Sequence, residues 1–374
     1  MLLTLAPDGM NELRSDERIL FYPTYARRDP AATGRQDADW LIDIHGIVFR
    51  PELTSRKRDL LTRFASRLLP RNDDTVEQTM FRRRFWTFLF DNIGDRTIHV
   101  RVGTQSYEVG TSSADGHFRG TVRLASQTIA SVLAGSSEAS AARQPSAIDP
   151  PGVHPRWLDF EAVTPAACRR RYRGQVTLIE PGGVSVISDI DDTIKISEVA
   201  DRSKLITNVL ARRYAAVPGM AEIYRQWASA GVACHFVSAS PWQLYWSLVR
   251  FCRHAGFPPA TYHLKKWRLR EPSTLDLFKA SAELKIDAIE QIIRDFPGRR
   301  FLLVGDSTQK DPEVYGELLR RRESQIALAL IRNVPGAEMS VQRLRSDFRD
   351  VPGDRWRVFD EAVDLLEACR PHVP

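Results

Sequence analysis

The carboxyl-terminal half of the chain alternates short apolar runs with amphipathic stretches. Four runs of mostly apolar residues predict buried strands, at 184–188, 232–237, 300–305 and 326–331. The spacing of apolar residues elsewhere predicts helices over 218–231, over 285–296, from about 312, and near 360–369. Continuous apolar strands joined by amphipathic helices are typical of a parallel sheet covered on both faces. We therefore predict a Rossmann-like α/β domain in this half.

The amino-terminal half has short alternating or aromatic-rich segments, separated by Gly, Pro and Asp. Strands are predicted within 18–50, within 97–124 and within 171–183, which favours an antiparallel sandwich or barrel. A helix is predicted over 56–70, and a long loop over 135–152, which is rich in Ser, Ala and Pro. We place the boundary at the 181–183 turn. This gives a β-sandwich-like domain over 1–180 and an α/β domain over 181–374.

Composition narrows the class of protein. The 374 residues are 43% hydrophobic and 27% charged, an ordinary globular balance. No apolar run reaches the roughly 18 residues that span a bilayer, and the first residues lack the basic region of a signal peptide. The four cysteines lie far apart and show no CxxC spacing. We therefore expect a cytoplasmic protein, with peripheral contact to a membrane left open.

The basic residues are clustered, and the net charge is +6. Clusters occur at 56–58, 82–84, 169–173, 265–270 and 320–322. Such surfaces favour anionic partners, which include phosphates, acidic lipid and nucleic acid. For any single cluster, a solvated arginine-rich surface is the alternative interpretation.

Carboxylates, a hydroxyl and an ammonium group gather at the ends of the predicted strands. They are Asp189, Asp191 and Asp192 after the first strand, Ser238 after the second, Asp306 and Asp311 after the third, and Lys285 at the start of the helix before it. Because functional groups collect at the carboxyl ends of parallel strands, we expect these side chains to share one crevice. A solvated turn or a helix cap is the alternative for the string DIDD taken alone.

Carboxylates this close together repel one another unless a cation offsets their charge. Oxygen ligands favour a hard ion, Mg²⁺ or Ca²⁺. A calcium loop that starts at Asp189 fails, because Ile194 and Ala200 stand where an EF-hand needs Gly and Glu. Mg²⁺ takes one or two carboxylates plus a substrate phosphate, so it is the expected cofactor.

The motifs resemble those of the haloacid dehalogenase superfamily of phosphohydrolases. They are DIDDT (189–193), FVS (236–238), Lys285 and GDSTQKD (305–311), in the order in which that superfamily has them. The surrounding sequence is similar to the catalytic domain of the actin-patch-associated phosphatidate phosphatases of fungi and their bacterial relatives. The similar segments are VSVISDIDDTIKIS (184–197), VSASPWQLY (237–245), DFPGRRFLLVGDS (295–307) and DPEVY (311–315), with FYPTYA (21–26) and GHFRGTV (116–122) upstream.

This resemblance implies a haloacid dehalogenase-like fold and a two-step phosphoryl transfer through an aspartyl-phosphate. Asp189 would be the nucleophile, and Asp191 would act first as general acid and then as general base. Ser238 and Lys285 would bind the phosphoryl oxygens, together with the loop of Asp191 and Asp192. Asp192 alternatively serves as a structural acceptor.

The same resemblance implies the metal ligands and the substrate. Mg²⁺ would be held by Asp189, the backbone carbonyl of Asp191 and Asp306, with support from Asp311. The expected substrate is phosphatidate, which would be converted to diacylglycerol. A soluble or nucleic-acid phosphomonoester is the alternative substrate, although nucleic acid is the less expected partner. An adaptor with a vestigial site is the alternative class.

Two further regions are candidates for specificity and targeting. The segments 196–216 and 241–280 are candidate caps over the site. The amino-terminal half contains RRR (82–84) followed by FWTFLF (85–90), which predicts delivery to an anionic membrane. In the alternative interpretation these aromatic residues belong to a core and the arginines are merely solvated.

Overall fold

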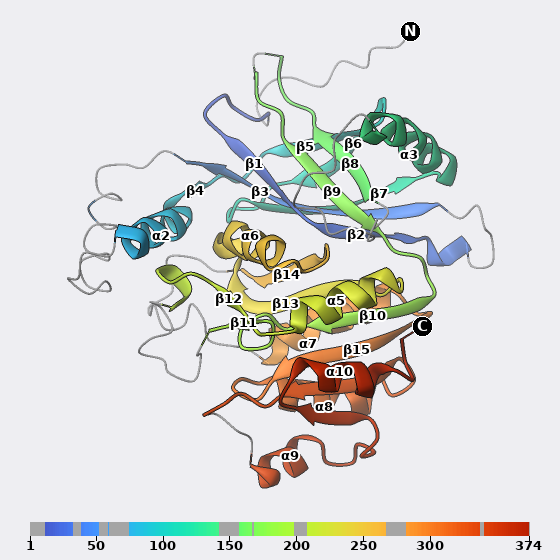
Figure 1. Ribbon diagram of the computed structural model, residues 1–374. Helices are drawn as coiled ribbons and strands as arrows, with labels where there is room; N and C mark the ends of the chain where they lie inside the picture. The colour runs from blue at the N-terminus through green and yellow to red at the C-terminus, as the bar shows by residue number, and fades with distance from the viewer. Residues whose placement is uncertain are drawn as a thin grey trace. The chain divides into compact units, whose positions relative to one another are not determined.

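The computed structural model describes residues 12–32, 39–51, 59, 75–141, 157–166, 168–197, 208–266, 282–336 and 340–373. The chain divides into two compact units, which are described separately here (Figure 1). The first takes residues from 1–53, 90–142 and 156–178, and the second takes residues from 54–89, 143–155 and 179–374. The predicted helix over 56–70 lies outside the described residues, apart from Asp59. The independence of a domain over 1–180 stays a prediction.

The first unit is built on one nine-stranded mixed sheet. Its main path runs β1-β3-β2-β9-β8-β5-β6, and both β4 and β7 pair with β3. The strands are β1 (Arg18–Tyr22), β2 (Thr24–Arg28), β3 (Trp40–Arg50), β4 (Asp91–Asn92), β5 (Thr97–Val102), β6 (Gln105–Thr111), β7 (His117–Leu124), β8 (Trp157–Ala162) and β9 (Arg173–Leu178).

This sheet curls so that β7 lies beside β6. The long strand β3 pairs with β1 and β2 on one edge and with β7 on the other. In β7, Gly120 lies so close to β6 that a Cβ atom would overlap the carbonyl oxygen of Val109. The predicted sandwich-like class is confirmed in this curled form. The β2–β9 pair is parallel, so the sheet is mixed and not antiparallel throughout.

The core of the first unit lies on the inner face of the curl, where Trp40, Phe118 and Phe160 are buried. Two helical segments accompany the sheet, η1 (Pro30–Ala32) and α3 (Ser126–Ala141). The loop predicted over 135–152 was wrong in its first part, because residues 135–141 continue α3. The Ser and Ala residues there are compatible with a helix, and the rest of the predicted loop, 142–152, is outside the described residues.

The second unit contains a six-stranded sheet in which all pairs are parallel, in the order β14-β13-β10-β15-β16-β17. Its strands are β10 (Gly183–Ser188), β13 (Ala233–Pro241), β14 (Thr261–Lys265), β15 (Arg299–Asp306), β16 (Ile326–Arg332) and β17 (Trp356–Phe359). The four predicted strands correspond to β10, β13, β15 and β16, so the predicted parallel α/β sheet is confirmed. The outer strands β14 and β17 had not been predicted.

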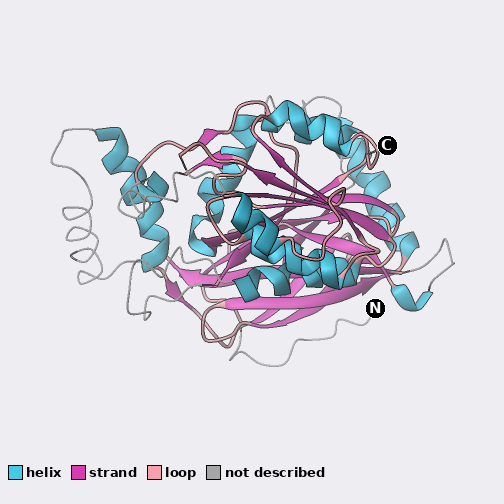
Figure 2. Cartoon of the chain, turned by 90° about the horizontal axis from the view of Figure 1, so that it is seen from below, coloured by secondary structure: helices cyan, strands magenta, loops and turns pink. Residues whose placement is uncertain are grey.

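Helices cover both faces of this sheet (Figure 2). Right-handed crossovers place the helices that precede β13 and β14 on one face and those that precede β15 and β16 on the other. The helices are α2 (Thr75–Trp86), α5 (Met220–Ser229), α6 (Tyr245–Ala255), α7 (Ala282–Asp295), α8 (Asp311–Arg321), α9 (Val341–Asp347) and α10 (Ala362–Cys369), with the 3₁₀ turns η2 (Thr87–Leu89) and η3 (Trp242–Leu244). A small hairpin of β11 (Lys195–Ile196) and β12 (Ala215–Ala216) follows β10.

The strand order reverses its direction at β10. The chain moves from β10 in one direction to β13 and β14, and later in the other direction to β15, β16 and β17. Open α/β sheets bind ligands where the order reverses in this way, outside the carboxyl ends of the strands. None of the described helices is long and apolar enough to cross a membrane.

Candidate active site

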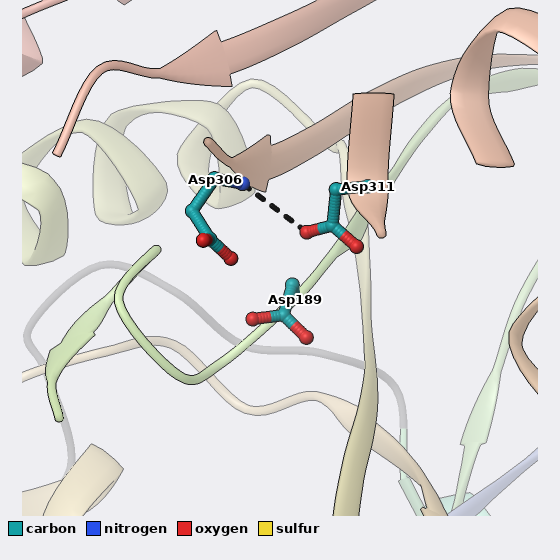
Figure 3. A group of neighbouring side chains, drawn as sticks. All are labelled: Asp189, Asp306 and Asp311. Carbon is teal, nitrogen blue, oxygen red and sulfur yellow. Dashed lines mark hydrogen bonds between the residues drawn. The ribbon is translucent and has the colours of Figure 1, made fainter. Parts of the chain in front are cut away.

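Three buried carboxylates meet at the carboxyl ends of β10 and β15. Asp189 follows β10 directly, Asp306 is the last residue of β15, and Asp311 begins α8. One oxygen of each lies within 4.8 Å of the others, and the three side chains face one another (Figure 3). The backbone joins the two strands here, because the Asp189 amide donates to the Val304 carbonyl at 2.9 Å. The sequence correctly predicted that these three residues come together.

Lys285 places one positive charge beside this cluster. It lies on α7, and its Nζ is 2.8 Å from Asp189 Oδ1 and also contacts Asp311 Oδ1. Burial opposes the charge on this lysine, but Asp189 and Asp311 raise its pKa above the ordinary value. Lys285 is therefore a fixed cation at the predicted nucleophile. Direct contact with a phosphoryl group stays a prediction.

One lysine does not balance three buried carboxylates. Burial raises the pKa of Asp189 well above its usual range, against the lowering effect of Lys285. Burial and the charge of Asp311 raise the pKa of Asp306 to about 8. A bound cation would favour the ionised form of both groups. The electrostatics therefore fit the expected metal site.

The donor set also fits a hard metal ion. Asp306 Oδ1 accepts a 2.7 Å hydrogen bond from the Thr308 amide, whereas its Oδ2 is buried with no hydrogen-bond partner among the described residues. Buried carboxylate oxygens without a partner are costly unless a cation takes them. In Asp311, Oδ1 contacts Lys285, and Oδ2 accepts a hydrogen bond from the Asp306 amide at 3.1 Å. Asp189, Asp306 and Asp311 are therefore the side chains that can hold Mg²⁺.

A glycine makes room for this arrangement. A Cβ atom on Gly305 would collide with the Asp311 carboxyl group. Any side chain at this position would therefore displace Asp311 from the cluster. In the Gly-Asp pair at the end of β15, Gly305 leaves room for Asp311, and Asp306 belongs to the carboxylate cluster.

Asp191 points to a different set of partners from those of the three clustered carboxylates. Its Oδ1 is 2.6 Å from Lys195 Nζ and accepts from Ser197 at 2.8 Å. Its Oδ2 accepts from Ser238 at 3.1 Å and from Ser240 at 2.8 Å. Burial would raise the pKa of this carboxyl, but the charge of Lys195 and these hydrogen bonds lower it below the ordinary value. The described structure thus holds Asp191 as a carboxylate.

Three of these partners were missed by the sequence analysis. Lys195, Ser197 and Ser240 are all buried beside Asp191. The four-residue spacing from Asp191 to Lys195 was the available signal for the lysine. For Ser240 it was the two-residue spacing from Ser238 on one strand, which places both side chains on the same face.

Asp192 shapes the loop. Its backbone is left-handed (φ 59°), its amide donates to the Lys195 carbonyl at 2.7 Å, and its Oδ1 accepts from the Ser197 amide at 2.7 Å. Arg332 donates to its carbonyl at 2.7 Å. These contacts favour the structural role for Asp192. Its predicted part in phosphate binding, and the metal contact of the Asp191 carbonyl, stay predictions.

Known proteins resemble the segment that carries this geometry. Residues 184–333 match the family "Phosphatidate phosphatase APP1, catalytic domain". The resemblance inferred from the motifs is thereby confirmed for this segment. The matched segment contains all seven residues singled out at the strand ends.

Two curated fungal proteins are similar to part of the chain. "Phosphatidate phosphatase APP1" of Saccharomyces cerevisiae is 32% identical over 193 residues, which are 50% of this chain and 31% of that protein. An uncharacterized protein of Schizosaccharomyces pombe is 28% identical over 170 residues, 44% of this chain and 27% of that protein. The matches thus span less than a third of either relative.

Among solved structures, the class C acid phosphatase of Bacillus anthracis matches 52% of this chain and 80% of its own. The sequence identity is 12% and the TM-score is 0.28. The architecture described above stands on the strand order itself.

Proposed function

We propose that this protein is a Mg²⁺-dependent phosphatase that acts through an aspartyl-phosphate, with phosphatidate as substrate and diacylglycerol as product. The observation that carries the proposal is the cluster of Asp189, Asp306 and Asp311 with Lys285 at the ends of β10 and β15. The match to the APP1 catalytic domain supports the reaction class, and the yeast relative supports the substrate.

In this proposal Asp189 attacks phosphorus, which breaks the bond to the alkoxide and forms an acyl-phosphate on Oδ. Lys285 offsets the negative charge of the incoming phosphate and holds Asp189 in place. Mg²⁺ held by Asp189, Asp306 and Asp311 would supply charge neutralisation between the carboxylate and the phosphate.

Asp191 protonates the leaving alkoxide and then takes a proton from the water that hydrolyses the acyl-phosphate. The four donors on its two oxygens favour the carboxylate, which suits the second of these roles. Ser238 donates to Asp191 in the described structure and binds a phosphoryl oxygen when the side chain turns to substrate.

Peripheral contact with anionic membrane is part of the proposal. The segment 82–90, which the sequence predicted to provide this contact, is only partly exposed. In the RRR-FWTFLF segment, Arg84, Phe85 and Phe88 are buried, whereas Arg82, Arg83 and Trp86 are exposed. The segment is therefore largely core. Exposed arginines at 169–171 in the first unit are the better candidates.

The test is release of inorganic phosphate from phosphatidate micelles, a sugar phosphate and 3′-phosphorylated DNA, each with Mg²⁺ and with EDTA. We expect the largest Mg²⁺-dependent release from phosphatidate, and none with the Asp189→Asn control. Preference for the sugar phosphate or the DNA would overturn the substrate and keep the chemistry. Release that EDTA leaves unchanged would overturn the mechanism.

A further inference from the structure

Helix α2 belongs to the second unit and carries a buried arginine, Arg84, near its carboxyl end. Arg84 donates from Nη1 to the carbonyl oxygens of Val209 and Arg212, both at 2.8 Å. Its guanidinium lies 3.8 Å from the centre of the Tyr214 ring. The arginine therefore holds the segment 209–214, which lies within a predicted cap.

Tyr214 connects Arg84 with the acid–base side of the site. Its hydroxyl donates to the Val209 carbonyl at 2.9 Å, and its ring centre lies 4.5 Å from Lys195 Nζ. An aromatic face attracts a cation that lies above it. Lys195 is in turn the ion-pair partner of Asp191. A continuous series of contacts thus leads from Arg84 through Tyr214 and Lys195 to Asp191.

The backbone carries the same connection. In the hairpin, Lys195 of β11 pairs with Ala216 of β12, and the Val217 amide donates to the Ile194 carbonyl at 3.0 Å. Tyr214 directly precedes β12. A displacement of the segment 209–214 therefore moves the strand that pairs with Lys195.

The burial of Arg84 is selective. Arg83, the preceding residue on the same helix, is exposed, whereas Arg84 is 8% exposed. Removing a guanidinium from water is unfavourable unless its donors are satisfied. The described contacts of the Arg84 guanidinium are with two carbonyl oxygens of the segment 209–214 and with one aromatic ring. This arrangement fixes the position of the segment with a directional, charged group where an apolar side chain would give only packing.

We propose that Arg84 is a positioning residue for the reaction, which fixes the orientation of Asp191 through Tyr214 and Lys195. The inference rests on the proposed function in one respect, since it gives Asp191 the acid–base role. It assigns to a residue more than one hundred positions upstream of Asp191 a part in catalysis that the motifs do not show.

The kinetic test compares Arg84→Gln with Arg83→Gln in the full-length protein, on the phosphomonoester that the wild type hydrolyses best. We expect Arg84→Gln to lower kcat by about 10- to 100-fold, because a misplaced acid–base group costs this much. We expect KM to stay within about twofold, since binding of the substrate is not the affected step. Arg83→Gln, which removes the same charge from an exposed position, leaves both values unchanged. An unchanged kcat in Arg84→Gln would overturn the proposal.

A second pair of variants isolates the ring and covers the case in which Arg84→Gln does not fold. Tyr214→Phe keeps the aromatic face and removes the hydroxyl, whereas Tyr214→Leu removes the face. Thermal unfolding identifies the folded variants. We expect Tyr214→Phe to keep kcat within a few-fold of wild type and Tyr214→Leu to lose as much as Arg84→Gln. Equal losses in the two Tyr214 variants would exclude the ring as the connecting element.

An activity-independent measurement separates this inference from the proposed function. The chain has few lysines, so NMR of ¹³C-lysine-labelled protein can resolve the ε-methylene of Lys195, assigned with Lys195→Arg. We expect an upfield ring-current shift in the wild type and in Arg83→Gln, and its loss in Arg84→Gln. A shift that persists in Arg84→Gln would overturn the positioning role. If the wild type hydrolyses no substrate in the panel, the proposed function fails and this resonance still decides whether Arg84 positions Lys195.

Discussion

Both units bury carboxylates, but they balance them differently. In the first unit, Glu17 is fully buried, and both of its oxygens accept 2.9 Å hydrogen bonds from the Arg96 guanidinium. Burial would raise the pKa of Glu17, but the bonds from Arg96 and from the Arg14 amide lower it below the ordinary value. In the second unit, three clustered carboxylates face one lysine, and the pKa of Asp189 and that of Asp306 are raised.

The difference distinguishes a structural ion pair from a functional cluster. The Glu17–Arg96 pair is complete within the chain and has no electrostatic need of a ligand. The cluster at Asp189 has more carboxylates than Lys285 can neutralise, so it fits a bound cation. Burial of charge is common to both, and only the balance of charge separates them.

The largest expected effect comes from Asp189→Asn. The amide keeps the shape of the carboxylate but cannot attack phosphorus, so activity should fall at least about 1,000-fold. Thermal stability without Mg²⁺ should be unchanged or higher, because one of the repelling charges is removed. Phosphate release and thermal unfolding of the same sample check both parts. More than a few per cent residual activity would rule out Asp189 as nucleophile.

The same type of change in the first unit should give the opposite result. Glu17→Gln leaves Arg96 buried without its counter-charge, which should lower the free energy of unfolding by about 3 kcal/mol. Below the unfolding temperature the kcat should match that of wild type. Denaturant unfolding and steady-state kinetics provide the measurements. A stability equal to that of the wild type would show that the pair contributes no more than a surface contact.

The pH dependence of stability should have opposite slopes in the two regions. Asp306 has a pKa of about 8 in the folded protein, above its value in the unfolded chain, so its effect on stability becomes less favourable as pH rises through the window between them. The slope from this one group is at most about 1.4 kcal/mol per pH unit. Mg²⁺ or Asp306→Asn should flatten it.

Glu17 contributes in the other direction, because its folded-state pKa is lowered. Its stabilisation is present above the unfolded pKa and is lost as pH falls through the folded value. Unfolding measured in EDTA from acid to alkaline pH, with Asp306→Asn and Glu17→Gln as the two comparison variants, separates the slopes. The charge-balance interpretation is wrong if Asp306→Asn leaves the upper slope unchanged.

The smallest expected effect concerns the exposed arginines of the two units and the binding of the protein to anionic vesicles. If the first unit contacts anionic membrane, replacing Arg169 and Arg171 with Gln should weaken sedimentation with phosphatidate-containing vesicles by about 1 kcal/mol per arginine at low salt. The matched control is the same change at Arg345 and Arg349, exposed arginines of the second unit. Binding should decrease as salt rises, since screening shortens the range of these charges. Equal losses in the two double variants would indicate a general charge effect without a dedicated surface.

The sequence was most informative where structure is local. The apolar runs before Asp189, Ser238 and Asp306 predicted their strands, and the rule that ligands bind at strand ends then brought the side chains together. Lys285 could be placed because its helix has a clear apolar face. The residues at the strand ends that form the site were therefore predictable from short segments of the sequence.

Contacts between distant positions were not predictable in this way. The parallel pairing of β2 with β9 joins residues about 150 positions apart, and neither strand carries a pattern that identifies the other. Arg84 lies in a run of three arginines, where a solvated surface was a reasonable expectation. Only the fold shows that one of the three is buried against the segment 209–214.

The chain order of the second unit has a consequence for how the protein forms. Its segment 54–89, which includes α2, lies between segments of the first unit in the sequence, so α2 is synthesised well before the strands of its own unit. The contact between Arg84 and Val209 closes a loop of 125 residues. Contacts of such high sequence separation form late, after local structure. We therefore expect the native position of α2 to be established late in folding.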